Sequence, residues 1–203
     1  MDNMAPSLFT TGTVAVSGGE VESGYWNGSN SGLAVSVPVG NDASLSGGTV
    51  EIEGRVGNGS YAYASLGSAV TLSSLDLSKD KVVTLSSLST VLSSLEGYGQ
   101  GVVLSFRALL TDAGGNKKDG FASNTTLIVD TIVPVDFTTG AVVVSGGVVE
   151  AGYWNGSNSG LTVRVPIADD ASLPGGTVQI QGRVGNGSYV ALGSVVTLSS
   201  GDL

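Results

Sequence analysis

The chain has 203 residues, of which 41% are hydrophobic and only 12% are charged, and its formal net charge is −9. This size allows one or two domains with cores of their own, and the acidic balance argues against nucleic acid or an anionic membrane surface as a partner. Because there is no Cys and no His, the chain lacks disulfides, imidazole bases and the commonest ligands of zinc and copper. Any bound metal is therefore expected to be a hard cation on oxygen ligands, with calcium as the leading candidate.

No apolar run approaches the roughly 18 residues of a membrane-spanning helix, so no membrane insertion is expected. The first ten residues, "MDNMAPSLFT", lack the basic start and the apolar core of a signal peptide. The destination of the protein is therefore not readable from this end of the chain.

The sequence repeats itself. The stretch "FTTGTVAVSGGEVESGYWNGSNSGLAVSVP", which begins at Phe9, recurs with few changes from Phe137, 128 residues later. The match continues to "TLSSLDL" and "TLSSGDL", except that two residues within 62–65 have no counterpart in the second copy. The sequence therefore predicts a tandem array, with a complete repeat over 1–133 and the N-terminal half of a second repeat over 134–203.

The predicted elements are almost all strands. Apolar and polar residues alternate over 13–18, 33–39 and 49–56, which is the pattern of half-buried strands. Asn58-Gly59 then predicts a hairpin turn. Further strands are expected over 61–72, 81–88, 101–112 and 122–130, with 101–112 in the centre of a sheet and 89–99 as a turn of helix or a crossing loop. About seven strands separated by turns predict an all-β fold of the β-sandwich class.

The heptapeptide "GYWNGSN" stands at 24–30 and again at 152–158. Its rings, Tyr25 and Trp26 in the first copy and Tyr153 and Trp154 in the second, have two possible roles. Exposed rings stack on sugars, whereas large aromatics in a sandwich more often pack in the core or at a corner. Since neighbouring residues of a strand point to opposite faces, we expect one ring of each pair to face inward and the other outward.

The end of the first repeat resembles a known family. "FRALLTDAGGN" at 106–116 and "TTLIVDTIVP" at 125–134 are similar to the closing pattern of bacterial immunoglobulin-like repeats, which occur in giant surface adhesins and extracellular matrix proteins. The resemblance implies an immunoglobulin-like sandwich at the cell surface or in the extracellular space. It also implies that the partners of each repeat are the neighbouring repeats of the same chain.

In that family, calcium is often held by acids at the joint between repeats and in nearby turns. The matching residues here are Asp112, Asn116 and Asp130, which Asp136 and Asp119 are able to join. The alternative is that Asp112 and Asn116 only make hydrogen bonds to the backbone of their turn. Calcium is thus the one cofactor that the sequence suggests.

No arrangement of residues indicates catalysis, because the paired acids have no base or metal partner and "GNGSY" is not a nucleophile elbow. The expected function is therefore non-enzymatic: a spacer or stalk repeat of a surface adhesin or extracellular fibrous protein, with joints stiffened by calcium. Two alternatives stay open. One is a multivalent carbohydrate-binding module that uses Tyr25 and Trp26 on surface glycans. The other is a fibre subunit that joins like chains by strand exchange at unpaired edges.

Overall fold

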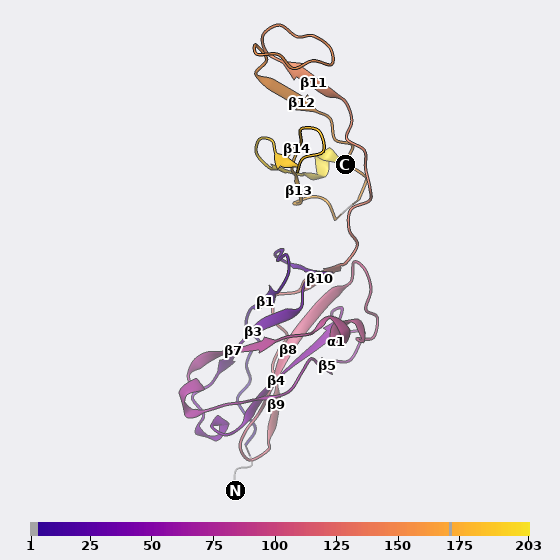
Figure 1. Ribbon diagram of the computed structural model, residues 1–203. Coiled ribbons are helices and arrows are strands. Elements are labelled where there is room, and N and C mark those ends of the chain that lie inside the picture. The colour runs from indigo at the N-terminus through magenta and orange to yellow at the C-terminus, as the bar shows by residue number, and fades with distance from the viewer. Residues whose placement is uncertain (1–3, 171) are drawn as a thin grey trace. The chain divides into compact units, whose positions relative to one another are not determined.

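The computed structural model describes residues 4–170 and 172–203. Internal contacts divide the chain into two units, Met1–Ile132 and Val133–Leu203, which are called the first and the second unit below (Figure 1). The division lies next to the predicted end of the first repeat. Each unit is described by itself.

The first unit consists of two β-sheets, as the sequence predicted for an all-β sandwich. One short helix and two turns of 3-10 helix lie in its connections. Its strands are β1 (Val14–Ser17), β2 (Tyr25–Asn27), β3 (Gly32–Val39), β4 (Thr49–Val56), β5 (Ala64–Ser65), β6 (Val70–Thr71), β7 (Lys79–Leu85), β8 (Val103–Thr111), β9 (Lys117–Asp119) and β10 (Leu127–Asp130). The helical segments are η1 (Ala43–Leu45), η2 (Ser74–Asp76) and α1 (Ser89–Ser93).

The strand order is that of an immunoglobulin-like sandwich. One sheet has the order β1-β3-β7, and the other has the order β2-β10-β8-β4-β5, with β6 beside β4 and β9 beside β8. All pairs are antiparallel except β2 and β10, which run parallel. The parallel pair joins the second strand of the unit to its last strand, and so links the two ends of the repeat.

The alternating pattern of the sequence accounts for β3 and β4. In β4, Val50 and Ile52 are fully buried, while Glu51 and Glu53, which alternate with them, are only partly buried on the other face. The strand pairs with β8 over its whole length, so that Ile52 stands opposite Ala108. Burial of each such side chain stabilises the fold by roughly 1.5–3 kcal/mol.

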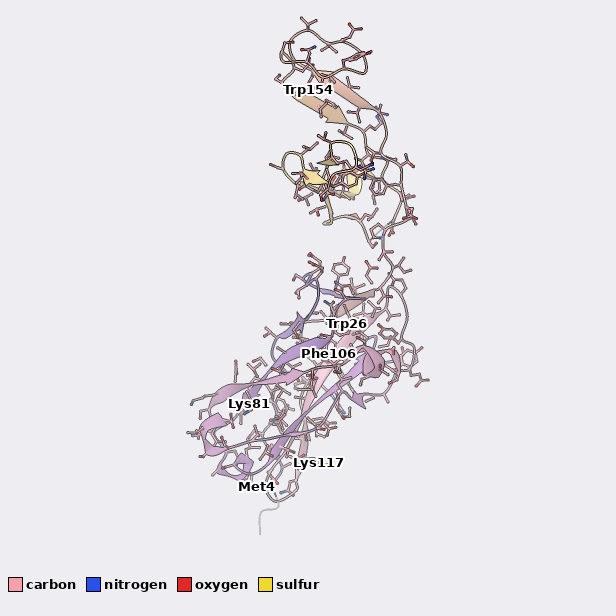
Figure 2. The ribbon with its side chains drawn as sticks, viewed as in Figure 1. Met4, Trp26, Lys81, Phe106, Lys117 and Trp154 are labelled. Carbon is pink, nitrogen blue, oxygen red and sulfur yellow. The ribbon has the colours of Figure 1, made fainter. Side chains whose placement is uncertain are left out.

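The core lies between the two sheets, and its largest fully buried side chains include Trp26 and Phe106 (Figure 2). Phe106 stands in the middle of β8, which carries the longest run of buried residues in the sheet. The remaining core is aliphatic and comes mainly from β3, β4, β7, β8 and β10. Leu88, Leu92 and Leu95 are contributed from around α1, and Val14, Leu45, Leu66 and Leu72 complete it.

The second unit repeats the first half of the first unit. Its pairs β11–β12 (Val142–Ser145, Gly160–Val163), β13–β16 (Thr177–Val178, Val196–Thr197) and β14–β15 (Gln181–Gly182, Val190–Ala191) are followed by η3 (Ser200–Asp202). They correspond to β1–β3, β4–β6 and β4–β5. For example, Val142 pairs with Val163 as Val14 pairs with Val35. The second unit thus keeps the strand register of the first unit, although it has fewer strands.

The strand pairing also shows which two residues of the first repeat have no counterpart in the second repeat. Ala64 stands opposite Gly54 in the first unit, and Val190 stands opposite Gly182 in the second. Tyr189 therefore corresponds to Tyr63, and the residues without a counterpart are Tyr61 and Ala62, slightly before the position that sequence matching suggested.

Most predicted strands are confirmed. Of the ten observed strands of the first unit, seven make up the main body of the two sheets. Residues 25–27 of the heptapeptide form a further strand, β2, which extends the sheet of β10. The short strands β5, β6 and β9 are additions at the edges of β4 and β8. No helix of the described residues is long and apolar enough to cross a membrane.

Candidate functional site

In the first unit, β2 pairs with β10, which is the last strand before the joint between the two units. Trp26 stands opposite Val129, and Tyr25 stands opposite Ile128. The side chains alternate as expected, so that Trp26 is only 2% exposed and Tyr25 is partly exposed. The heptapeptide therefore holds the last strand of the repeat from one side, while β8 pairs with it on the other side.

The indole of Trp26 belongs to the core and not to a surface platform. It lies beside Tyr98, whose hydroxyl has a pKa raised by burial, an effect that the neighbouring Trp26 side chain opposes. A buried ring offers no face to a sugar, which argues against Trp26 as a stacking residue. In the second unit, by contrast, Trp154 is 58% exposed and Tyr153 is also exposed.

Hydrogen bonds from Asn27 and Asn30 of the heptapeptide fix the loop before it, an arrangement that we call the loop lock. Asn30 is buried, and its side-chain amide donates to the backbone oxygens of Gly18 (3.0 Å) and Glu20 (2.9 Å). Its carbonyl oxygen accepts from the backbone N–H of Asn27 at 2.7 Å. Asn27 in turn donates to the oxygen of Glu20 at 2.7 Å and accepts from the backbone and hydroxyl of Ser29.

The second unit contains the same lock. The amide of Asn158 donates to the backbone oxygens of Gly146 and Val148, both at 2.9 Å, and Asn155 donates to Val148 at 2.8 Å. The lock thus forms without the strands that bury Trp26 in the first unit. Both N–H groups of the Asn158 amide are thus used by the backbone of its own loop, as are those of Asn30 in the first unit.

The exit of the chain towards the joint is fixed by Gln100. Its amide donates to a carboxylate oxygen of Asp130 at 2.6 Å, and its carbonyl oxygen accepts from the backbone N–H of Thr131 at 2.9 Å. The backbone of Gly101 also donates to the oxygen of Val129 at 2.8 Å. Asp130 and Thr131, two residues of the predicted joint, are therefore held against the end of the first unit.

The predicted calcium ligands Asp112 and Asn116 meet in the turn between β8 and β9. The carboxylate of Asp112 accepts from the backbone N–H of Asn116 at 2.8 Å and from its side-chain amide at 2.9 Å. Hydrogen bonds from Asn116 hold the pKa of Asp112 below its usual value, with backbone N–H groups of the turn adding to the effect. The carboxylate thus accepts hydrogen bonds from the backbone and from a side chain of its own turn.

Asp130 does not join them. It is the last residue of β10, which pairs with the start of β8 through Leu104 and Val103, whereas Asp112 follows the end of β8. The nine residues of β8 span roughly 30 Å. Asp119 ion-pairs with Arg107 instead, and Asp136 belongs to the second unit.

The predicted calcium ligands therefore do not form one site in the first unit. No group of three or more acids suited to a metal ion is found among residues 4–170 and 172–203.

The outer face of the second sheet carries a cluster of charged and aromatic groups. Arg107 donates to Glu53 at 2.6 Å and ion-pairs with Asp119 at 2.8 Å. The ring of Tyr63 lies between two guanidinium groups, 4.3 Å from that of Arg55 and 4.4 Å from that of Arg107. In the second unit, Arg183 stacks on Tyr189 at 4.7 Å. The cluster ties β4, β5, β8 and β9 together from outside.

Sequence reasoning missed several of these residues. Gln100 and Asn30 act through long-range or buried hydrogen bonds that no local pattern indicates. The only signal for Asn30 is that its heptapeptide recurs letter for letter. Tyr61 was also missed: its ring covers Gly97, where an added Cβ would lie 2.5 Å from the ring.

No family model matches the chain, and no curated protein is significantly similar to it.

Proposed function

We propose that the chain is a non-enzymatic spacer repeat of a bacterial surface adhesin or extracellular fibrous protein, and that it works by transmitting tension along a tandem array. One observation carries the proposal. The strand nearest the joint, β10, is held by parallel pairing to β2, which comes from the beginning of the same unit.

The parallel pairing suits a unit that is pulled through its two ends. In the first unit, the N-terminal end and the end of β10 lie at opposite ends of the sandwich (Figure 1). Tension therefore acts along β2 and β10 in opposite directions. All hydrogen bonds between the two strands then bear the force together, instead of opening one after another. The buried Trp26 adds packing resistance, because sliding β2 along β10 would pull the indole out of the core.

Hydrogen bonds also hold the residues at the joint. The contacts of Gln100 with Asp130 and Thr131 fix the direction in which the chain leaves the sandwich. We assign part of the stiffening of the joint to this side chain, because it holds both Asp130 and Thr131. The second unit begins the same fold again with the same strand register. This supports a function in which successive units of an array carry tension one after another.

The location at the cell surface is part of the proposal and has its own test. Antibodies raised against residues 4–132 are expected to label intact cells of the source organism. Label that appears only after the cells are broken would contradict this location.

The mechanical part is tested by pulling single molecules of the whole chain through their two ends. Because β2 and β10 lie side by side, their separation releases the chain between Tyr25 and Asp130, roughly 350 Å at ~3.4 Å per residue. One large event of this length is expected. Gradual extension without a force peak would contradict a role in bearing tension.

A further inference from the structure

The sequence contains Asn-Gly-Ser at four places, which begin at Asn27, Asn58, Asn155 and Asn186. Glycine after asparagine leaves the asparagine side chain open to attack by the next backbone nitrogen. The reason is that glycine has no Cβ in the way and adopts backbone conformations that other residues avoid. In an unfolded chain, the four asparagines are expected to react at similar rates, because the reacting residues are the same. The fold holds them differently.

The reaction in question is deamidation through a cyclic imide. The backbone nitrogen of the glycine gives up its proton to the solvent and bonds to the side-chain carbonyl carbon, Cγ, of the asparagine. The bond between Cγ and Nδ2 breaks, and ammonia leaves. Water then opens the ring at either of its carbonyl carbons, which gives aspartate or isoaspartate. Water is the only co-reactant, and the chain gains one negative charge.

In the first unit, the loop lock restrains Asn27. Its Nδ2 donates to the backbone oxygen of Glu20 at 2.7 Å, and its Oδ1 accepts from the backbone N–H and the hydroxyl of Ser29. Asn27 also ends β2, where it stands opposite Asp130 of β10. Both polar atoms of the amide and the backbone beside it are thus fixed, and ring closure requires these contacts to break. The corresponding side-chain bonds recur at Asn155.

Asn58 is much less restrained. It lies in the exposed turn between β4 and β5, between Gly57 and Gly59, whose φ angles are 70° and 152°. A Cβ added at either glycine would meet no atom within 4 Å beyond its neighbours in the chain. Oδ1 of Asn58 accepts from the hydroxyl of Ser105 at 3.1 Å, and this hydroxyl also donates to the oxygen of Gly57 at 3.0 Å. Within residues 4–170 and 172–203, neither Nδ2 of Asn58 nor the N–H of Gly59 donates a hydrogen bond.

We propose that Asn58 is a site of spontaneous deamidation, and that the loop lock protects Asn27 from the same reaction. At Asn58, the group that leaves and the nitrogen that attacks are both exposed to solvent and held by no other part of the turn. Asn186, the counterpart in the second unit, is also exposed, but the N–H of Gly187 donates to the oxygen of Val184 at 3.0 Å. Asn186 is therefore expected to react more slowly than Asn58. This inference does not depend on the proposed mechanical function.

The folded unit is able to accept the product. A carboxylate at position 58 keeps an acceptor for the hydroxyl of Ser105, and a hydrogen bond to a charged acceptor is stronger than one to an amide. Ser105 stands opposite Arg55 in the pairing of β4 with β8, so that the new negative charge arises near a positive one. The open space around Gly57 and Gly59 accommodates the longer main chain of isoaspartate. The modified unit is therefore expected to stay folded with one more negative charge.

The direct test incubates the whole folded chain in mildly alkaline buffer and follows the four sites by mass spectrometry. Trypsin cleaves after Lys and Arg, so the four sites fall in four different peptides. Asn58 is expected to convert at least about tenfold faster than Asn27, because ring closure at Asn27 must break several hydrogen bonds. Equal rates at the two positions, or no conversion of Asn58, would overturn the proposal. A faster reaction at Asn186 than at Asn58 would overturn the part assigned to the glycine N–H.

Two comparisons show whether the fold sets the rates. In urea, the four sites are expected to convert at similar rates, and a difference that persists there would exclude the fold as its cause. Asn30→Ala breaks the loop lock without changing either residue of the reacting pair. In this variant Asn27 is expected to convert several-fold faster, while Asn58 in the same molecule keeps its rate. An unchanged rate at Asn27 would overturn protection by the loop lock.

Two variants of Asn58 test the site and its product. Asn58→Gln keeps the amide but cannot form the five-membered ring. It is expected to slow the build-up of acidic forms of the whole chain on an ion-exchange column. Equal build-up would overturn Asn58 as the main site. Asn58→Asp is expected to elute with the aspartate form and to unfold at the same urea concentration as the unchanged protein. A clearly less stable Asn58→Asp variant would overturn the claim that the folded unit accepts the product.

Discussion

Trp26 and Val129 are paired residues of two parallel strands that come from opposite ends of the first repeat. This relationship joins the beginning of the unit to the strand that leads into the joint. The indole is buried in the same place where the strands meet. If the unit bears tension as proposed, its stability and its resistance to tension depend on the same few residues.

Replacement of Trp26 by Ala is expected to lower the free energy of unfolding of the first unit by about 3–5 kcal/mol, because it leaves a large cavity in the core. Trp154→Ala is the matched control from the same heptapeptide. Its ring is 58% exposed, so a change within about 0.5 kcal/mol is expected. Urea unfolding followed by far-ultraviolet circular dichroism measures both. Equal losses would contradict the different burial of the two rings.

Asn30→Ala tests the loop lock. The change removes the acceptor of the backbone N–H of Asn27 and a donor to the backbone oxygens of Gly18 and Glu20, and it is expected to lower the free energy of unfolding by about 1–3 kcal/mol in total. Asn124→Ala, at an exposed position, serves as the control and should unfold like the unchanged protein. A neutral Asn30→Ala variant in the same urea titration would show that the lock does not hold the unit together.

The pH dependence of stability is expected to involve Asp76. A hydrogen bond from Lys81, with further bonds from Ser73, lowers the pKa of Asp76 from 3.8 to about 2. The unfolded chain therefore takes up the proton first. The contribution of the ionised Asp76 to the free energy of unfolding is present above about pH 4 and is lost as the pH falls towards about 2.

The Asp76→Asn variant separates this contribution from those of other acids. It should unfold at lower urea concentration than the unchanged protein at pH 7, and the difference should narrow at low pH. A difference that stays constant down to about pH 2 would exclude the ionised carboxylate as its cause.

Calcium is expected to leave the stability of the first unit unchanged. The carboxylate of Asp112 is engaged by its own turn, and Asp130 lies at the other end of β8. A ligand that binds the folded state raises the melting temperature, so thermal melting in calcium and in a chelator decides the question. A higher melting temperature in calcium, lost in the Asp112→Ala variant, would restore the calcium site that the sequence suggested.

Much of the fold follows from local patterns, because β3, β4 and β8 alternate or form long apolar runs that only a sheet satisfies. β2 could not be predicted in this way. Its three residues lie among turn formers, and they become a strand only because β10, about a hundred residues later in the chain, pairs with them. Strand formation of this kind depends on tertiary context more than on propensity.

The candidate site was only partly predictable for the same reason. The sequence correctly placed Asp112 with Asn116 in one turn, since they are close along the chain. It could not show that Asp130 lies at the far end of β8, because that follows from strand direction in the folded sheet. Nor could it show the hydrogen bonds of Gln100 with Asp130 and Thr131, which connect residues about thirty positions apart.

The most direct test of the account compares two directions of pulling on single molecules. The chain has no Cys, so one cysteine introduced at Ser60, in the turn between β4 and β5, gives a unique second handle. Force between the two chain ends acts along β2 and β10, whereas force between position 60 and the C-terminal end acts across the sheet. The account predicts a clearly higher unfolding force for the first direction, reduced by Trp26→Ala and not by Trp154→Ala. Equal forces in the two directions would contradict it.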